Sequence, residues 1–191
     1  MTVGAGTADG EAPWVGDVIR FWLEETPPEK RFKKDEALDS EIRARFEALY
    51  DRVAADPPDT AALTPRLALA TLIVLDQFSR NMFRGSPKAF AADSVALSIA
   101  RAAVAKGLDR QLETTERLFV YLPFEHSESL ADQDQAVELI AGLGNAEWDR
   151  YAVAHRDIIL RFGRFPHRNE VLGRASTAEE LAFLEQPGSS F

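Results

Sequence analysis

The sequence predicts an all-α fold in which about eight helices pack as antiparallel pairs around one core. Apolar residues recur at helical spacing along nearly the whole chain, and no stretch shows the alternation of a half-buried strand. Proline, glycine and capping residues divide the chain into short helical segments joined by short loops, which is typical of helical-pair folds. We expect helices over residues 14–24, 38–54, 65–81, 87–106, 115–122, 130–143, 146–162 and 177–185.

The first three helices have apolar stripes and clear boundaries. The first ends before Pro27, because proline cannot continue a helix. The second places Ile42 and Phe46 on one apolar face. Thr64 followed by Pro65 starts the third, since a threonine hydroxyl caps the free N–H groups of the first turn and proline is suited to its first position.

The fourth and fifth helices are predicted from similar signals. Ser86 and Pro87 repeat the start signal of the third helix, and Gly107 ends the fourth as a C-terminal glycine. Pro123 is expected to break the fifth helix. The residues that follow it are therefore predicted to form a non-helical turn.

The last three helices depend on serine and glycine positions. Ser129 is expected to cap the sixth helix, and Gly163 to end the seventh. Ser176 with Glu179 matches the spacing of a capping box and predicts a short final helix.

Length and composition indicate a single globular domain. The chain has 191 residues, of which 46% are hydrophobic and 28% charged, as in ordinary soluble proteins. Residues 1–13 are rich in glycine and alanine, so we expect a disordered N-terminal tail followed by one helical domain over residues 14–191.

Charge and cysteine content exclude several classes of function. A net charge of −9 argues against nucleic acid, whose binding depends on clustered basic residues. The absence of cysteine excludes disulfides, thiol nucleophiles and cysteine-ligated zinc. The N-terminus lacks the pattern of a secretory signal, and the longest predominantly apolar run, residues 67–75, which includes Thr71, is far shorter than the roughly 20 residues that span a bilayer. We expect a cytoplasmic protein that binds neither nucleic acid nor membrane.

The segment 160–174 is the most unusual part of the sequence, because it carries four arginines in an acidic chain. Pro166 forces Phe165 into extended geometry, so the residues around them lie on irregular backbone. Guanidinium groups on rigid backbone recognise carboxylate or phosphate groups, but nearby carboxylates can neutralise them just as well. The candidate ligand-binding residues of this segment are Arg164, Arg168, Asn169 and Arg174.

A second candidate group lies at the end of the third helix. Asp76 falls on the apolar stripe of that helix, where an unpaired carboxylate costs several kcal/mol. Arg80, four residues further on, is its nearest candidate partner, and Asn81 and Arg84 follow it. The group either forms one wall of a ligand site or is an internal ion pair that anchors the helix end.

The third candidate group follows Pro123. Glu125, His126 and Glu128 occur together, and a histidine beside carboxylates suits general acid–base chemistry. The same residues are equally compatible with a turn in which a serine caps the next helix.

The histidines do not predict a metal site. His155 lies on the apolar stripe of the seventh helix and is expected to be a hydrogen-bonded structural residue. The sequence has no HExxH spacing and no cysteine, so we expect no metal and no cofactor.

Several strings resemble the bacterial domain of unknown function nine-two-four, a family grouped with tetratricopeptide-like helical folds. The resemblance runs from about residue 18 to the end of the chain. It implies an all-α, tetratricopeptide-like array of helix pairs and supplies no reaction and no catalytic residues. The matching strings are LDQFSRNMFRG (75–85), AFAADSVAL (89–97), YLPFEHSE (121–128), HRDIILRFGRFPHRNEVLGR (155–174) and STAEELAFL (176–184).

Two functions remain open at this point. The first is binding of a small anionic ligand, a carboxylate or phosphate, in a pocket lined by arginine and histidine, with His126, Glu125 and His167 as candidate catalytic residues. The second is a tetratricopeptide-like scaffold for a peptide or protein partner, in which the arginine segment is only a structural ion-pair lock. A homodimer is compatible with either function.

Overall fold

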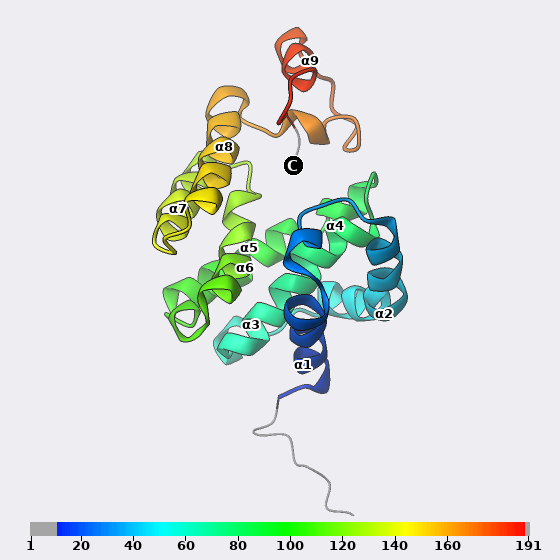
Figure 1. The fold of residues 1–191 in the computed structure, drawn as a ribbon, viewed down its shortest axis with the longest axis vertical. Coiled ribbons are helices and arrows are strands. Elements are labelled where there is room, and N and C mark those ends of the chain that lie inside the picture. Colours follow the sequence, from blue (N-terminus) through cyan, green and yellow to red (C-terminus); the bar gives the residue numbers. More distant parts are fainter. Residues whose placement is uncertain (1–10, 190–191) are drawn as a thin grey trace, which may run out of the picture.

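The computed structural model describes residues 11–189, and within that range the chain forms helices and loops without any strand (Figure 1). The all-α prediction is therefore confirmed, and each of the eight predicted helical segments is present in the described part. Of the predicted N-terminal tail, residues 1–10 lie outside the described residues, and Pro13 already belongs to the first helix.

Two of the eight helices contain a π-helical turn. The turn η1 (Phe21–Glu25) extends α1, and η4 (Ile73–Phe78) joins α3 to α4 in one continuous helix. The α-helices are α1 (Pro13–Arg20), α2 (Glu36–Ala55), α3 (Pro65–Leu72), α4 (Ser79–Met82), α5 (Asp93–Ala105), α6 (Thr114–Glu125), α7 (Leu130–Ala141), α8 (Ala146–Phe162) and α9 (Ala178–Leu184).

The continuous helix α3–η4–α4 is central to the packing. α3 packs against α1, α5 and α6, while η4 and α4 pack against α2. α7 and α8 lie side by side at one flank, and α9 lies at the end of the molecule opposite α1 (Figure 1). Every residue of η4 is buried, so any polar side chain on it must find its partners inside the protein.

Aromatic side chains fill the main core. The ring of Trp22 packs edge-on against Phe78 and Phe119, with ring centroids 5.5 and 6.0 Å apart. A second, smaller apolar cluster holds the C-terminal part of the chain to α8, and it consists of Ile158, Ile159, Phe162, Phe165 and Phe183.

The start of the fourth helix differs from the prediction. Ser86 does cap a turn, since its hydroxyl accepts a hydrogen bond from the Lys88 N–H. That turn is a 3₁₀ segment, η5 (Pro87–Phe90), and α5 begins only at Asp93. The capping chemistry was identified correctly, but a cap does not determine whether an α-helix or a 3₁₀ turn follows it.

The predicted break at Pro123 is wrong. α6 continues through Pro123 to Glu125, and the His126 N–H still donates to the Leu122 carbonyl at 2.8 Å. The last eight residues of α6 are all buried. Packing on all sides offsets the hydrogen bond that proline removes, and it makes Glu125 a helical residue rather than part of an open turn.

Two predicted caps differ from the structure: Ser129 occupies the N-cap position of α7 without a side-chain bond, and the capping box of α9 lies one residue further on. The Ser129 side chain makes no capping hydrogen bond to α7, and the neighbouring Ser127 hydroxyl donates to Asp132 in the first turn of that helix. The capping box of α9 is formed by Thr177 and Glu180 rather than by the pair one residue earlier. Adjacent hydroxyl residues offer alternative registers that the spacing alone does not separate.

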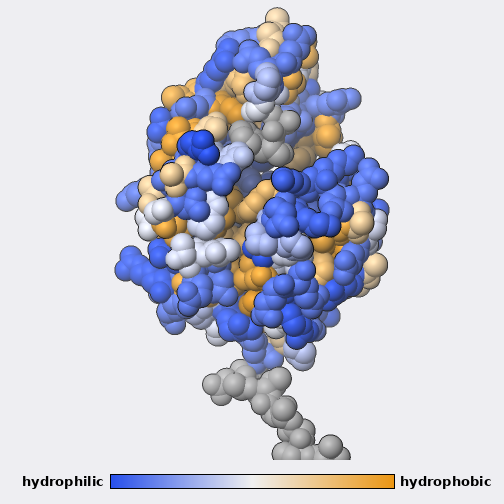
Figure 2. All heavy atoms as spheres, in the orientation of Figure 1, coloured by the Kyte–Doolittle hydropathy of each residue, from blue (hydrophilic) through white to orange (hydrophobic). Residues whose placement is uncertain are grey.

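The length and polarity of the helices argue against a membrane-spanning segment among residues 11–189. Within residues 11–189, the helices are all too short or too polar to cross a bilayer. The face shown in Figure 2 is mostly hydrophilic and is interrupted by hydrophobic patches.

Candidate functional site

A buried polar centre forms where η4, α4, the first turn of α5, the end of α6 and the 3₁₀ turn η7 (Pro166–Arg168) meet. We use the name polar centre for five residues that are joined to one another by hydrogen bonds or ion pairs. They are Asp76, Arg80, Asp93, His126 and Arg168.

Asp76 is the anion at the middle of the polar centre, with only 1% of its side chain exposed. Its Oδ1 lies 2.7 Å from His126 Nδ1 and 3.1 Å from Arg80 Nη1, and its Oδ2 accepts from Gln77 Nε2 at 2.7 Å. Burial would raise the pKa of Asp76, but Arg80, His126 and Gln77 outweigh burial and hold that pKa well below its ordinary value. Asp76 is therefore ionised at neutral pH.

His126 is held in one tautomer by Asp76. A carboxylate can only accept a hydrogen bond, so Nδ1 of His126 carries the proton and Nε2 of the neutral ring is an acceptor. Burial and Arg80 lower the pKa of His126 and outweigh the opposite effect of Asp76, so the ring is neutral at pH 7. Nε2 makes no hydrogen bond to any residue of the described range, and 14% of the side chain is exposed.

Arg80 and Asp93 form the best-matched ion pair of the polar centre. Nη1 and Nη2 of Arg80 donate to the two carboxylate oxygens of Asp93 at 2.9 and 3.0 Å, which is the bidentate geometry that arginine favours. Arg80 Nη1 also donates to the backbone carbonyl of Asp76 at 3.0 Å. The guanidinium is thus fully engaged by protein acceptors.

Arg168 is a buried arginine that is only partly paired. Its side chain is 7% exposed, and its Cζ lies 4.3 Å from the ring centroid of Phe165 and 4.8 Å from that of Phe90. Nη1 donates to the His126 carbonyl at 3.1 Å and lies 3.5 Å from the nearest oxygen of Asp93.

The opposite edge of the Arg168 guanidinium has no protein acceptor. Nε is buried without a hydrogen-bond partner, and Nη2 makes no hydrogen bond to any residue between 11 and 189. Burial and Arg80 lower the pKa of Arg168 to about 10, so the group remains charged at pH 7. Two parallel N–H donors on one edge of a guanidinium match the two oxygens of a carboxylate or phosphate.

Glu125 lies next to the polar centre on the last turn of α6. Burial raises its pKa to about 8, and the negative charge of Asp76 adds to this effect. Its Oε1 is 3.1 Å from His155 Nδ1. Glu125 is therefore predominantly protonated at pH 7.

The two other histidines are also neutral. Nδ1 of His155 lies 2.8 Å from the Tyr151 carbonyl, as expected for a structural histidine, and burial with His126 lowers its pKa to about 3. Burial and Arg168 lower the pKa of His167 to about 4, and its ring lies 5.6 Å from that of Phe165.

Two arginines of the segment 160–174 are occupied by internal carboxylates. Arg164 pairs bidentately with Glu180, at 2.6 and 2.7 Å, and Arg174 pairs bidentately with Glu128, at 2.7 and 3.0 Å. Glu128 also accepts from the Phe165 N–H at 2.8 Å. These pairs fasten the irregular backbone of the segment. Nε of Arg174 is also buried without an acceptor among the described residues, but the adjacent Nη2 is already bonded to Glu128 and to the Phe165 carbonyl, so that edge does not offer two free donors.

The remaining predicted site residues lie outside the polar centre. Asn81 and Arg84 both donate to Asp39 of α2, at distances between 2.8 and 3.0 Å. Asn169 donates to Ser176 at 3.0 Å. The structure therefore brings Asp76, Arg80, His126 and Arg168 together and assigns the others to contacts between segments.

Sequence reasoning missed four residues that complete these contacts. Asp93 and Phe90 belong to the polar centre and its wall, while Asp39 and Glu180 pair with predicted arginines. In the sequence alone, Asp93, Glu180 and Asp39 cannot be distinguished from ordinary acidic residues on the exposed faces or first turns of helices. The pairing of helix ends from distant parts of the chain carries no local signal.

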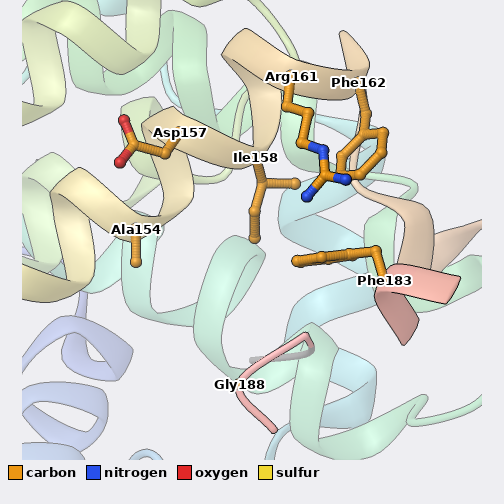
Figure 3. Close-up of a pocket in the computed structure, with 7 residues that line it drawn as sticks. All are labelled: Ala154, Asp157, Ile158, Arg161, Phe162, Phe183 and Gly188. Atoms are coloured by element: carbon orange, nitrogen blue, oxygen red, sulfur yellow. The ribbon is translucent and has the colours of Figure 1, made fainter. Parts of the chain in front are cut away.

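The polar centre does not line either of two surface pockets formed by described residues. One, of about 230 Å³, lies between α8 and the C-terminal segment, where Arg161 and Phe162 face Phe183 and Asp157 points away (Figure 3). The other, of about 490 Å³, is lined by α1, α2 and the loop after α2. Among the described residues, no group of three or more histidine or acidic side chains is arranged to hold a metal ion.

Comparisons with known proteins agree on the family and on the fold. Residues 18–188 match the model of a family described as "Bacterial protein of unknown function (DUF924)". The structure is similar to that of a protein of unknown function, ATU0120, from Agrobacterium tumefaciens, with 38% sequence identity and a TM-score of 0.84 over 90% of this chain and 96% of that one. The curated proteins contain no match to the chain.

Proposed function

Because the chain belongs to the bacterial family of unknown function DUF924, we propose a function from the polar centre itself: it binds a small anionic ligand, a carboxylate or phosphate, through Arg168. The observation that carries the proposal is the Nε–Nη2 edge of a charged, buried guanidinium, which finds no acceptor among the described residues. A buried donor without an acceptor costs about 1–3 kcal/mol, so a ligand that supplies two acceptors gains what the free protein lacks.

The surrounding residues favour an anion at Arg168 rather than at the other arginines. Arg164 and Arg174 have complete bidentate partners, and Arg80 is paired with Asp93. The aromatic rings of Phe90 and Phe165 hold the Arg168 plane and limit water around it, which strengthens a charge-assisted hydrogen bond.

Thermal unfolding with added anions tests this proposal. Inorganic phosphate, acetate and glycolate at matched ionic strength are added to wild-type protein, and at least one is expected to raise the melting temperature in a saturable way. At 100 times Kd, the stabilisation would be about 2.7 kcal/mol. Absence of stabilisation by all three anions would contradict the proposal.

Two variants locate the effect. Arg168→Lys keeps the positive charge and removes the bidentate edge, so the anion-induced shift is expected to disappear. Arg161→Lys is the matched control, because Arg161 belongs to the same segment and pairs with the exposed Glu179. An anion-induced shift that survives in Arg168→Lys would place the site elsewhere.

A second candidate function, binding of an apolar side chain from a peptide partner, is favoured by the pocket in Figure 3. Ile158, Phe162 and Phe183 line it, and Arg161 lies over the Phe162 ring at 4.6 Å. Peptide-array binding of wild-type protein and Phe183→Ser tests this function. Binding that does not depend on Phe183 would count against it.

A further inference from the structure

A second unpaired group lies beside Arg168, and it is an acceptor rather than a donor. Nδ1 of His126 donates to Asp76 at 2.7 Å, so Nε2 of the neutral ring carries no proton and can accept a hydrogen bond. The same residue is in direct contact with Arg168, since its carbonyl accepts from Arg168 Nη1 at 3.1 Å. The polar centre therefore contains two N–H donors of Arg168 and one nitrogen acceptor of His126 that make no hydrogen bond to a described residue.

An anion alone satisfies only half of this arrangement. Carboxylate and phosphate oxygens pair with the Arg168 edge, but oxygen lone pairs that face a neutral Nε2 repel it. Sites built around a buried hydrogen-bonding group reject ligands that lack the complementary group far more strongly than apolar sites reject small changes in shape.

We propose that the ligand carries its own hydrogen-bond donor, a hydroxyl or an acid proton, which it donates to His126 Nε2 while Arg168 holds its anionic oxygens. This inference rests on the anion site proposed above. It narrows the ligand to a protic anion, such as a 2-hydroxy carboxylate or hydrogen phosphate.

The arrangement also separates two kinds of phosphate. Inorganic phosphate keeps at least one acidic proton at neutral pH, whereas a phosphate monoester, with a second pKa near 6, has lost most of its last one. A monoester would fit only if another hydroxyl of the same molecule reached Nε2. Sulfate, which has the shape of phosphate and no proton, is the mismatched ligand.

The groups that face His126 support a fixed tautomer at neutral pH. From η4 it meets Asp76, from α4 Arg80, from η7 His167 and Arg168, and from α8 His155, whose ring lies 6.2 Å away. Asp76 is ionised and His155 is neutral at pH 7. Among the described residues, Asp76, Arg80 and Arg168 make no hydrogen bond to Nε2.

Two matched pairs of anions test the inference at pH 7.5 and constant ionic strength. Isothermal titration is expected to give a Kd for phosphate at least tenfold lower than that for sulfate, and a Kd for glycolate at least tenfold lower than that for acetate. If no anion binds, the anion site itself is wrong. If both members of each pair bind equally, the anion site stands and the requirement for a donor is wrong.

A variant and a spectrum assign the selectivity to His126. His126→Phe removes the acceptor and retains an aromatic ring, so both preferences are expected to fall to within about twofold of unity while binding to Arg168 persists. Because this variant can fail to fold, long-range ¹H–¹⁵N NMR of the wild-type imidazole provides an independent measurement. It is expected to show a proton on Nδ1, and a change at Nε2 on addition of phosphate but not of sulfate. A proton on Nε2 in the free protein would overturn the inference.

Discussion

The carboxylate of Asp76 lies 2.7 Å from the imidazole of His126, although fifty residues separate them in the sequence. The contact joins the π-helical turn η4 to the end of α6 and fixes the proton of His126 on Nδ1. It is therefore both a tertiary link between two helices and the reason that His126 presents an acceptor.

Replacement of Glu125 by glutamine should stabilise the protein in mildly alkaline solution. The folded-state pKa of about 8 is above the unfolded value of 4.5, so the native state binds more protons between these values and stability falls as pH rises through this range. Glutamine does not titrate, so the Glu125→Gln variant should not lose unfolding free energy as the pH rises through this range. We expect the gain in unfolding free energy from Glu125→Gln to be roughly 2 kcal/mol larger at pH 8 than at pH 6.5. Equal gains at the two pH values, measured by urea denaturation, would contradict a buried, titrating Glu125.

His155 should be a main cause of the loss of stability in acid, together with His167, whose pKa is also lowered, to about 4. Its folded pKa of about 3 is below the unfolded value of 6.5, so the native state binds fewer protons in between, and stability falls as pH decreases below 6.5. The loss at pH 4.5 amounts to about 3 kcal/mol. His155→Gln can still donate to the Tyr151 carbonyl and should flatten this part of the pH–stability curve. An unchanged slope between pH 6.5 and 4.5 would assign the acid sensitivity to another group.

The pair Arg164–Glu180 should behave as a structural lock. Arg164→Met leaves the buried Glu180 carboxylate without its bidentate partner and should cost about 2 kcal/mol. Glu180→Gln in the same chain keeps the cap of α9 and removes the stranded charge, so the double variant should recover part of the loss. A double-mutant cycle in urea measures this coupling. Additive losses would mean that the pair contributes no interaction energy.

Gly163 should be needed only for its backbone conformation. It ends α8 with φ of +68°, and a Cβ added there would meet no atom within 4 Å. Gly163→Ala should therefore cost about 1 kcal/mol through left-handed strain alone, and Gly163→Asn should cost less. Equal losses for the two variants would indicate a steric cause instead.

The helices could be predicted from the sequence because their signals are local. Thr64 caps α3 through its hydroxyl as expected, and Gly163 adopts the left-handed conformation predicted for a helix end. Pro123 was misjudged, because its effect depends on tertiary packing around α6, which local signals do not contain.

The polar centre could be predicted only in part, for a related reason. Asp76 was identified because a charge on an apolar stripe conflicts with its surroundings, and such conflicts are visible in sequence. Asp93 causes no conflict at the start of α5, so its pairing with Arg80 became apparent only from the packing of that helix against η4. Which arginine remains open was likewise undecidable, since it depends on the positions of Glu128 and Glu180.

The π-helical turn η4 sets the angular register of everything after it. A π-helical turn holds more residues than an α-helical turn, so winding the same six residues, Ile73–Phe78, as α-helix would rotate the residues that follow about the helix axis. Arg80 would then leave the side that faces Asp93, and Met82 would leave the core. The length of this one turn, in addition to the identity of its side chains, therefore determines whether the polar centre can assemble.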